Sequence, residues 1–200
     1  MIPEYLEVMV SEGVHVALDL RWMELAHDLD ERLAAPLARA WSDLAATERG
    51  DVVNADENRR VGHYWLRAPE LAPDGLGTEI SESWHAVERV VLRYTGRFVR
   101  VLVVGIGGSA LGPQLVADAL GRSGDIRSVS FLDNTDPDGI TRTLRAMAPL
   151  SEVLVIVISK SGGTPETRNG YLVVQAAFEA AGLSFAEHAI AVTQVGSKLH

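Results

Sequence analysis

The chain has 200 residues, of which 47% are hydrophobic and 22% charged, a composition that is ordinary for a globular protein and excludes a disordered chain. The net charge of −9, with no basic run, argues against nucleic acid or an anionic membrane as the main partner. Because there is no cysteine, disulfides, thiolate metal sites and a cysteine nucleophile are excluded.

The N-terminal segment does not resemble an export signal. Residues 1–10 carry acidic side chains where a signal peptide needs a basic region followed by an apolar one. Elsewhere, no apolar run approaches the roughly 18 residues that a membrane span needs. We therefore expect a soluble protein of the cytoplasm, a compartment with which the absence of cysteine is consistent.

Residues 1–96 are predicted to be a mainly helical region, because two stripes of apolar residues recur every three or four positions. The first stripe consists of Leu25, Leu29, Leu33, Leu37, Trp41 and Leu44, and Pro36 within it predicts a kink or a break into two helices. The second consists of Ile80, Trp84, Val87, Val91 and Tyr94 and is ended by Gly96. Between them, residues 47–78 are expected to form loops around a short ordered piece at 63–66.

Residues 97–200 are predicted to form a separate α/β domain. Four short apolar, β-branched runs indicate strands at 99–104, 128–132, 153–158 and 189–193. Helical stretches fall between them, at 112–121, 137–148 and 165–181. Strands that alternate with helices indicate βαβ units, so the expected fold is a three-layer αβα arrangement with a parallel sheet, of the Rossmann or flavodoxin type.

The loops after the four predicted strands carry the main sign of a binding site. In an open parallel sheet, ligands bind outside the carboxyl ends of the strands. These loops are residues 105–109, 133–137, 159–165 and 194–198; all of them are polar and three contain glycine. We therefore expect a site where they meet.

The first of these loops leaves two interpretations open. Gly105-x-Gly107-x-x-Ala110 satisfies a loose dinucleotide fingerprint, and Asp133 supplies the acid that the fingerprint wants after the second strand. Glycines also let a backbone approach an anion, and a helix predicted to have Pro113 near its first turn would offer its amides. The alternative is a tight turn between strand and helix that binds nothing.

The third loop favours a phosphate more clearly. Ser159, Ser161 and two glycines offer hydroxyl and amide donors around one point, with Lys160 as a nearby cation. Thr164 suits an N-cap and Glu166 suits the first helical turn, where a carboxylate offsets the helix dipole. The alternative is that Ser159, Thr164 and Glu166 only cap a helix, because capping and phosphate binding use the same groups.

The second loop is expected to support the fold. Asp136 followed by Pro137 is typical of an N-cap and the first helical residue. The acids Asp133, Asp136 and Asp138 leave a Mg²⁺ site open, but none of the 6 histidines has a metal-site spacing such as His-Glu-x-x-His. We expect no metal and no cofactor, and no acid–base machinery is evident.

Three of these loops occur in the order and at the spacing of a known family. They read VGIGGSALGP at 104–113, DNTDP at 133–137 and SKSGGTPET at 159–167. Together they closely resemble the glucose-6-phosphate isomerase family, in which this half of the protein is a sugar isomerase (SIS) domain. NRRVGHYWLR at 58–67 and the pairs Thr193-Gln194 and Ser197-Lys198 also resemble family segments, so the resemblance covers residues 55–200.

The resemblance implies the family's activity, which is the interconversion of glucose 6-phosphate and fructose 6-phosphate without a metal. The sugar ring opens, and a proton then moves between C1 and C2 through a cis-enediol(ate). The resemblance also implies that Gly108 and Ser109 line the sugar pocket and that the full-length protein is a homodimer.

The resemblance further implies how the phosphate of the sugar is held. Ser159, Ser161 and Thr164 would grip it, with Lys160 beside it, in agreement with the interpretation of the third loop from its residues alone. A grip on the phosphate supplies binding energy away from the reacting carbons and positions C1 and C2 for proton transfer.

The catalytic groups of the family are expected to lie outside this chain. The arginine that supports the enediolate, the glutamate base, and the histidine and lysine of ring opening all lie downstream of the family position that matches Lys198. We therefore expect the N-terminal part of a longer isomerase, with its SIS domain truncated at the C-terminal end. Such a part would contain no catalytic residue and would bind sugar phosphate without isomerising it.

Two other functions stay open. A non-catalytic SIS module that senses a phosphosugar would share every local feature of the site, but the N-terminal region contains no basic recognition helix. An NAD-dependent oxidoreductase would use the first loop and would leave the Ser159–Thr164 loop without a function. This function is therefore the least favoured of the three.

Overall fold

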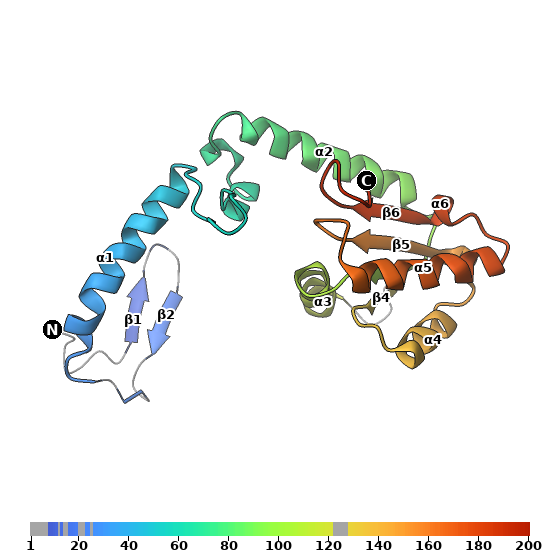
Figure 1. Cartoon of the computed structure of the whole chain (residues 1–200), viewed down its shortest axis with the longest axis horizontal. Coiled ribbons are helices and arrows are strands. Elements are labelled where there is room, and N and C mark those ends of the chain that lie inside the picture. The colour runs from blue at the N-terminus through green and yellow to red at the C-terminus, as the bar shows by residue number, and fades with distance from the viewer. Residues whose placement is uncertain (1–7, 12, 14–15, 20–22, 25, 122–127) are drawn as a thin grey trace. The chain divides into compact units, whose positions relative to one another are not determined.

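The computed structural model describes residues 8–11, 13, 16–19, 23–24, 26–121 and 128–200. The chain divides into two compact units, Met1–Glu88 and Arg89–His200, and helix α2 (Leu76–Tyr94) contains the boundary between them. The elements are labelled along the chain in Figure 1. Among the described residues, no helix combines the length and the apolar composition that crossing a membrane requires.

The first unit is mainly helical, as predicted, and it also contains a small sheet that the sequence analysis did not predict. Strand β1 (Val8–Ser11) pairs antiparallel with β2 (Val16–Asp19). Helical elements follow: α1 (Leu29–Glu48), η1 (His63–Leu66), which is the predicted short ordered piece, and η2 (Pro69–Leu71). Short apolar runs such as VMVS and VALD cannot be assigned to strand or helix by periodicity alone.

Helix α1 runs through Pro36 as a single helix, so of the two predicted alternatives the break into two helices is wrong, and the kink stays a prediction. Proline removes one backbone donor and crowds the preceding turn, at a cost of about 3 kcal/mol. Here Ala34, Ala35 and Leu37 surround it, and alanine and leucine are among the strongest helix formers. Leu25, the first residue of the predicted stripe, lies outside the described residues.

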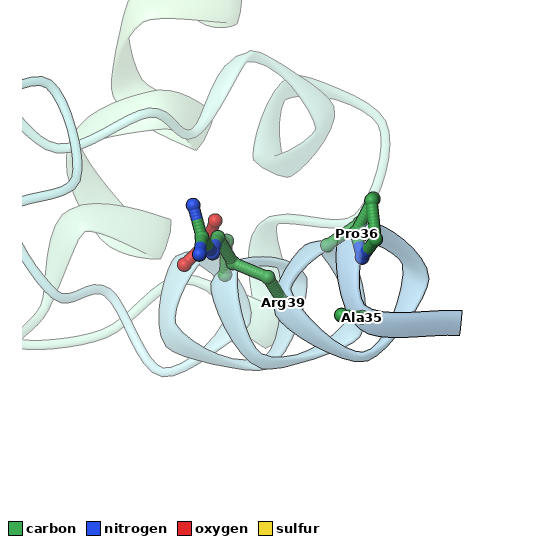
Figure 2. Close-up of a pocket in the computed structure, with 5 residues that line it drawn as sticks. Ala35, Pro36 and Arg39 are labelled. Atoms are coloured by element: carbon green, nitrogen blue, oxygen red, sulfur yellow. The ribbon is translucent and has the colours of Figure 1, made fainter. Parts of the chain in front are cut away.

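The apolar stripe of α1 is largely exposed to solvent. Leu37, Trp41 and Leu44 keep 51%, 68% and 47% of their surface accessible. Figure 2 shows a hollow on this helix, where Ala35, Pro36 and Arg39 line it. Every residue that lines the hollow belongs to α1, so it brings together no groups from different elements and is not a candidate for the functional site.

The second unit confirms the predicted α/β fold. Parallel strands lie in the order β4-β3-β5-β6 and are flanked by helices (Figure 1). The strands are β3 (Arg100–Val104), β4 (Ser128–Leu132), β5 (Val153–Ile158) and β6 (Ala189–Val192), each within one residue of its predicted run. The helices are α3 (Gly108–Leu120), α4 (Pro137–Ala146), η3 (Leu150–Glu152), α5 (Pro165–Ala180) and α6 (Phe185–His188).

The core of the second unit forms where α5 packs on the two central strands. Leu102 of β3 and Val155 of β5 are fully buried, as are Val174 and Phe178 of α5. These residues belong to one hydrophobic cluster, which explains why the central strands are almost continuously apolar. The core therefore holds the carboxyl ends of β3 and β5, and the loops that follow them, on a rigid base.

Helix α3 begins at Gly108, four residues before the predicted start. Gly107 has a φ of 56°, a left-handed conformation that glycine adopts without strain, and it lets the chain turn directly from the strand into the helix. The amides of Ala110 and Leu111 both donate to Gly107 O, at 3.0 and 2.9 Å. Pro113 consequently lies inside the helix and not near its start, which places Gly108 and Ser109 in the first turn.

Candidate functional site

The strand order brings two glycine-containing loops to the same place. Strands β3 and β5 are neighbours in parallel register, with Val104 opposite Val157, although β4 lies between them in the sequence. Helical connections leave the sheet in opposite directions from such a point, and it is where open α/β sheets bind ligands. Residues 105–109 and 159–164 therefore meet at the carboxyl edge.

Gly105 shows how tightly its own loop turns against the carboxyl end of β5. A Cβ at this position would lie 2.9 Å from Ser109 Cβ and 3.2 Å from the carbonyl oxygen of Ile158. The first distance is shorter than real side chains tolerate, so only glycine fits without a shift. We call residues 159–164, which follow β5, the Ser159 loop. Gly108 and Ser109, the predicted sugar-pocket residues, lie in the first turn of α3, which follows the neighbouring strand β3.

Ser159 and Thr164 face each other across the Ser159 loop. Ser159 directly follows β5 and is only 4% exposed, and its Oγ lies 3.3 Å from Thr164 Oγ1. Thr164 occupies the N-cap position of α5. Within the described range 128–200, its side chain accepts no hydrogen bond from an amide of this helix. The expectation that Thr164 caps the helix therefore holds for its position and not for its hydroxyl.

The remaining residues of the Ser159 loop form a tight turn. The amide of Gly162 donates to Ser159 O at 3.2 Å, and the amide of Gly163 donates to Ser161 Oγ at 3.2 Å. Gly162 has a φ of 64°, which an L-residue adopts only with strain. Lys160 is exposed at the edge of this turn, and its carbonyl accepts from the amide of Gln194 at 3.2 Å.

Helix α5 adds its positive end to this turn. Pro165 is its first residue and has no N–H, while Glu166 occupies the first turn, as predicted. Arg168 is the first helix residue whose amide donates back, to Thr164 O at 3.0 Å. The amides before it point out of the helix end, where they favour an anion. The hydroxyls of Ser159 and Thr164 thus lie beside the amides at the start of α5.

The loop after β4 is held by its own hydrogen bonds. Asp136 accepts from the amides of Asp138 at 3.3 Å and Gly139 at 2.8 Å and so caps α4. Both oxygens of Asp133 are engaged, one by Gln114 Nε2 at 2.8 Å and the other by Asn134 Nδ2 at 3.0 Å. Asp133 thus ties the loop after β4 to helix α3, and the remaining lone pairs of its carboxylate leave the dinucleotide interpretation untested.

The described residues contain no group of three or more His, Asp or Glu side chains that could hold a metal ion. Asp133, Asp136 and Asp138 are therefore not such a group, and the expectation of no metal stays a prediction. The carboxylates of Asp133 and Asp136 bond to side-chain amides and to backbone amides of the same region.

Removing the carboxylate of Asp136 is expected to destabilise the fold. The substitution Asp136→Ala should lower the free energy of unfolding by about 1 kcal/mol, because two amides of α4 lose their acceptor. Asp136→Asn keeps an acceptor in the same place and should cost only a few tenths of a kcal/mol. Urea denaturation of the chain measures both, and an equal loss for the two variants would contradict a capping role.

Sequence reasoning missed the support that the Ser159 loop receives from the loop after β6. Thr193 Oγ1 donates to Ser159 O at 2.7 Å and lies 2.7 Å from Ser197 Oγ. Both residues were quoted for their family resemblance, with no role assigned. The only available signal was that hydroxyl residues follow a fourth parallel strand, and it becomes informative once β6 is known to lie beside β5.

Comparisons with known proteins agree with the resemblance predicted from the three loops. The family model described as Phosphoglucose isomerase matches residues 34–199. A glucose-6-phosphate isomerase of Cyanothece sp. is 50% identical over 195 residues, which cover 92% of this chain and 37% of that protein. One of Geobacter sulfurreducens is 50% identical over 194 residues, covering 91% of this chain and 37% of that protein.

A solved structure also resembles the chain. The crystal structure of a glucose-6-phosphate isomerase from Chlamydia trachomatis superposes with a TM-score of 0.75 at 27% identity, covering 88% of this chain and 36% of that one. The chain thus spans little more than a third of the length of these relatives. The match of the family model over most of the chain, together with the fold, shows that the chain belongs to the phosphoglucose isomerase family.

Proposed function

We propose that the chain supplies the phosphosugar-binding part of a glucose-6-phosphate isomerase, which interconverts glucose 6-phosphate and fructose 6-phosphate. The observation that carries this proposal is the Ser159 loop. Its hydroxyls of Ser159 and Thr164 lie 3.3 Å apart at the start of α5, and the Thr164 hydroxyl is not used for capping. A doubly charged phosphate needs such a set of donors at a helix N-terminus.

In this proposal the phosphate accepts hydrogen bonds from Ser159, Ser161 and Thr164, and Lys160 adds a positive charge beside it. A lysine acts on phosphate as a compact point charge, which suits its exposed place at the edge of the turn. Gly108 and Ser109 contact the sugar from the neighbouring loop. Asp136 and Glu166 support the helices that begin at the site.

The role of these residues in the reaction is to hold the substrate in place. The family's reaction opens the sugar ring and moves a proton between C1 and C2 through a cis-enediol(ate). Binding energy from the phosphate, which does not react, fixes the position of these carbons. We assign no proton-transfer group to this chain, and we propose that isomerisation requires groups outside its 200 residues.

The proposal also covers the organisation of the protein. Residues 97–200 form the SIS domain that binds the phosphosugar, and residues 1–96 form a helical N-terminal region. The full-length protein is a homodimer, as the family resemblance implies, and the composition places it in the cytoplasm. Neither a metal nor another cofactor takes part. Nucleic acid and membranes are not partners, in keeping with the net charge of −9.

Isothermal titration calorimetry and an activity assay test the proposal. The chain is expected to bind fructose 6-phosphate saturably and not to bind NAD. In a coupled assay it should not convert fructose 6-phosphate into glucose 6-phosphate. Binding of NAD alone would favour the oxidoreductase that the Gly105–Ala110 pattern left open. Isomerisation by the chain would contradict the assignment of the proton-transfer groups to other residues.

A further inference from the structure

Two hydroxyls in the loop after β6 form a one-way chain of hydrogen bonds that ends on the Ser159 loop. Thr193 Oγ1 donates its proton to Ser159 O at 2.7 Å. A hydroxyl has only one proton, so the 2.7 Å contact between Thr193 Oγ1 and Ser197 Oγ must use the proton of Ser197. Ser197 Oγ in turn accepts from the amide of Leu199 at 3.2 Å. We call this chain of donors, from Leu199 through Ser197 and Thr193 to Ser159, the hydroxyl relay.

The relay acts on the carbonyl group that closes the Ser159 loop. Ser159 O accepts from Thr193 Oγ1 and also from the amide of Gly162 at 3.2 Å, so both of its lone pairs are engaged. Because a peptide unit is planar and trans, fixing this oxygen also fixes the direction of the Lys160 N–H. The relay thus sets the orientation of the backbone between the proposed phosphate ligands.

The relay also lies against the turn at Gly162. A Cβ on Gly162 would be 2.5 Å from the amide nitrogen of Leu199 and 2.8 Å from Ser197 Oγ. The loop after β6 is therefore in direct contact with the Ser159 loop. Hydrogen bonds from Ser159 N to Val192 O at 3.1 Å and from Gln194 N to Lys160 O at 3.2 Å continue the pairing of β5 with β6 into both loops.

We infer that Thr193 and Ser197 are positioning residues of the phosphate site, which hold the Ser159 loop in its binding shape before the ligand arrives. Consecutive hydroxyl donors polarise one another, so the relay restrains the Ser159 carbonyl more firmly than an isolated hydrogen bond would. This inference rests on the proposed function, because it assumes that the Ser159 loop binds the phosphate. Neither side chain needs to touch the substrate.

Calorimetry of the chain with inorganic phosphate and with fructose 6-phosphate tests the inference. Thr193→Val should weaken the binding of both ligands about tenfold, since it removes the middle of the relay. Thr193→Ser restores the hydroxyl and should bind within about twofold of the original chain. Thr95→Val is the matched control, because Thr95 Oγ1 also donates to a backbone carbonyl at 2.7 Å but lies at the end of α2. It should leave binding unchanged.

Three results would overturn the inference while leaving the proposed function intact. They are unchanged binding by Thr193→Val, a loss that Thr193→Ser shares, and an equal loss in Thr95→Val. If Thr193→Val does not fold, Ser197→Ala decides the question. It removes the proton donated to Thr193 and the acceptor of the Leu199 amide, and it leaves the Thr193 hydroxyl on Ser159 O in place; about threefold weaker binding is expected. Full binding by that variant would also contradict the relay. Failure of the unaltered chain to bind phosphate would overturn the proposed function itself.

Discussion

The double substitution Ser159→Ala with Thr164→Ala is expected to weaken the binding of fructose 6-phosphate by about 100-fold or more. A hydrogen bond to a charged group contributes roughly 1.5–3 kcal/mol, and each 1.4 kcal/mol corresponds to a factor of ten. The two hydroxyls lie 3.3 Å apart and converge on one point at the start of α5. A phosphate group at that point would lose both donors together. Isothermal titration calorimetry with the chain measures the change directly.

A matched control separates this effect from the general cost of removing hydroxyls. Ser83→Ala with Thr95→Ala deletes the same two groups from helix α2 and from the residue that follows it, where they donate to the carbonyls of Glu79 at 2.8 Å and Val91 at 2.7 Å. This control should bind fructose 6-phosphate like the original chain. Circular dichroism establishes that both variants keep their helix content. Equal affinities of the two double variants would show that the Ser159 loop does not bind the phosphate.

The central strands of the second unit could be predicted because their sequences leave little choice. Residues 153–158 read VLVIVI, and a run of this kind without polar interruption fits a strand that is buried on both faces. The start of α3 was predicted less well, because its position depends on the left-handed conformation of Gly107. A sequence shows that glycine permits such a turn, and not that the turn is made there.

The candidate site could be predicted as a set of loops and not as a set of contacts. Each loop after a parallel strand must lie at the carboxyl edge, so their gathering follows from the fold class. Which loops touch depends on the order β4-β3-β5-β6, which does not follow from the order along the chain. The bond from Thr193 to Ser159 spans 34 residues and exists only because β6 lies beside β5.

The Thr164 hydroxyl illustrates a second limit of sequence reasoning. A threonine followed by proline and glutamate is a good N-cap sequence, and the helix does begin there. Whether its hydroxyl bonds to the helix or turns toward Ser159 is a choice of side-chain rotamer, which residue order does not determine. That choice decides whether the hydroxyl caps the helix, and only the three-dimensional arrangement reveals it.

Gly162→Ala is expected to abolish measurable binding of fructose 6-phosphate and to lower the free energy of unfolding by about 3 kcal/mol. Left-handed backbone costs a non-glycine residue about 1–2 kcal/mol, and Gly162 has a φ of 64°. The new Cβ would also meet the amide nitrogens of Leu199 at 2.5 Å and Lys198 at 2.9 Å. These are backbone atoms, which cannot rotate away, so one of the two loops must move. Denaturant unfolding and calorimetry measure the two effects.

Two neighbouring glycines separate the backbone strain from the collision. Gly196 has a φ of 77°, but a Cβ there would meet nothing within 4 Å, so Gly196→Ala should show only the strain, about 1–2 kcal/mol, and retain binding. Gly163 has no positive φ, and a Cβ there would keep at least 3.8 Å from other atoms, so Gly163→Ala should change stability by less than about 1 kcal/mol. If Gly162→Ala lost no more stability than Gly196→Ala and still bound fructose 6-phosphate, the close contact between the two loops would have no part in forming the site. We expect Gly162→Ala to be less stable than both controls and to bind fructose 6-phosphate far more weakly than either. This result would mean that the Ser159 loop binds only in the shape that the loop after β6 imposes on it.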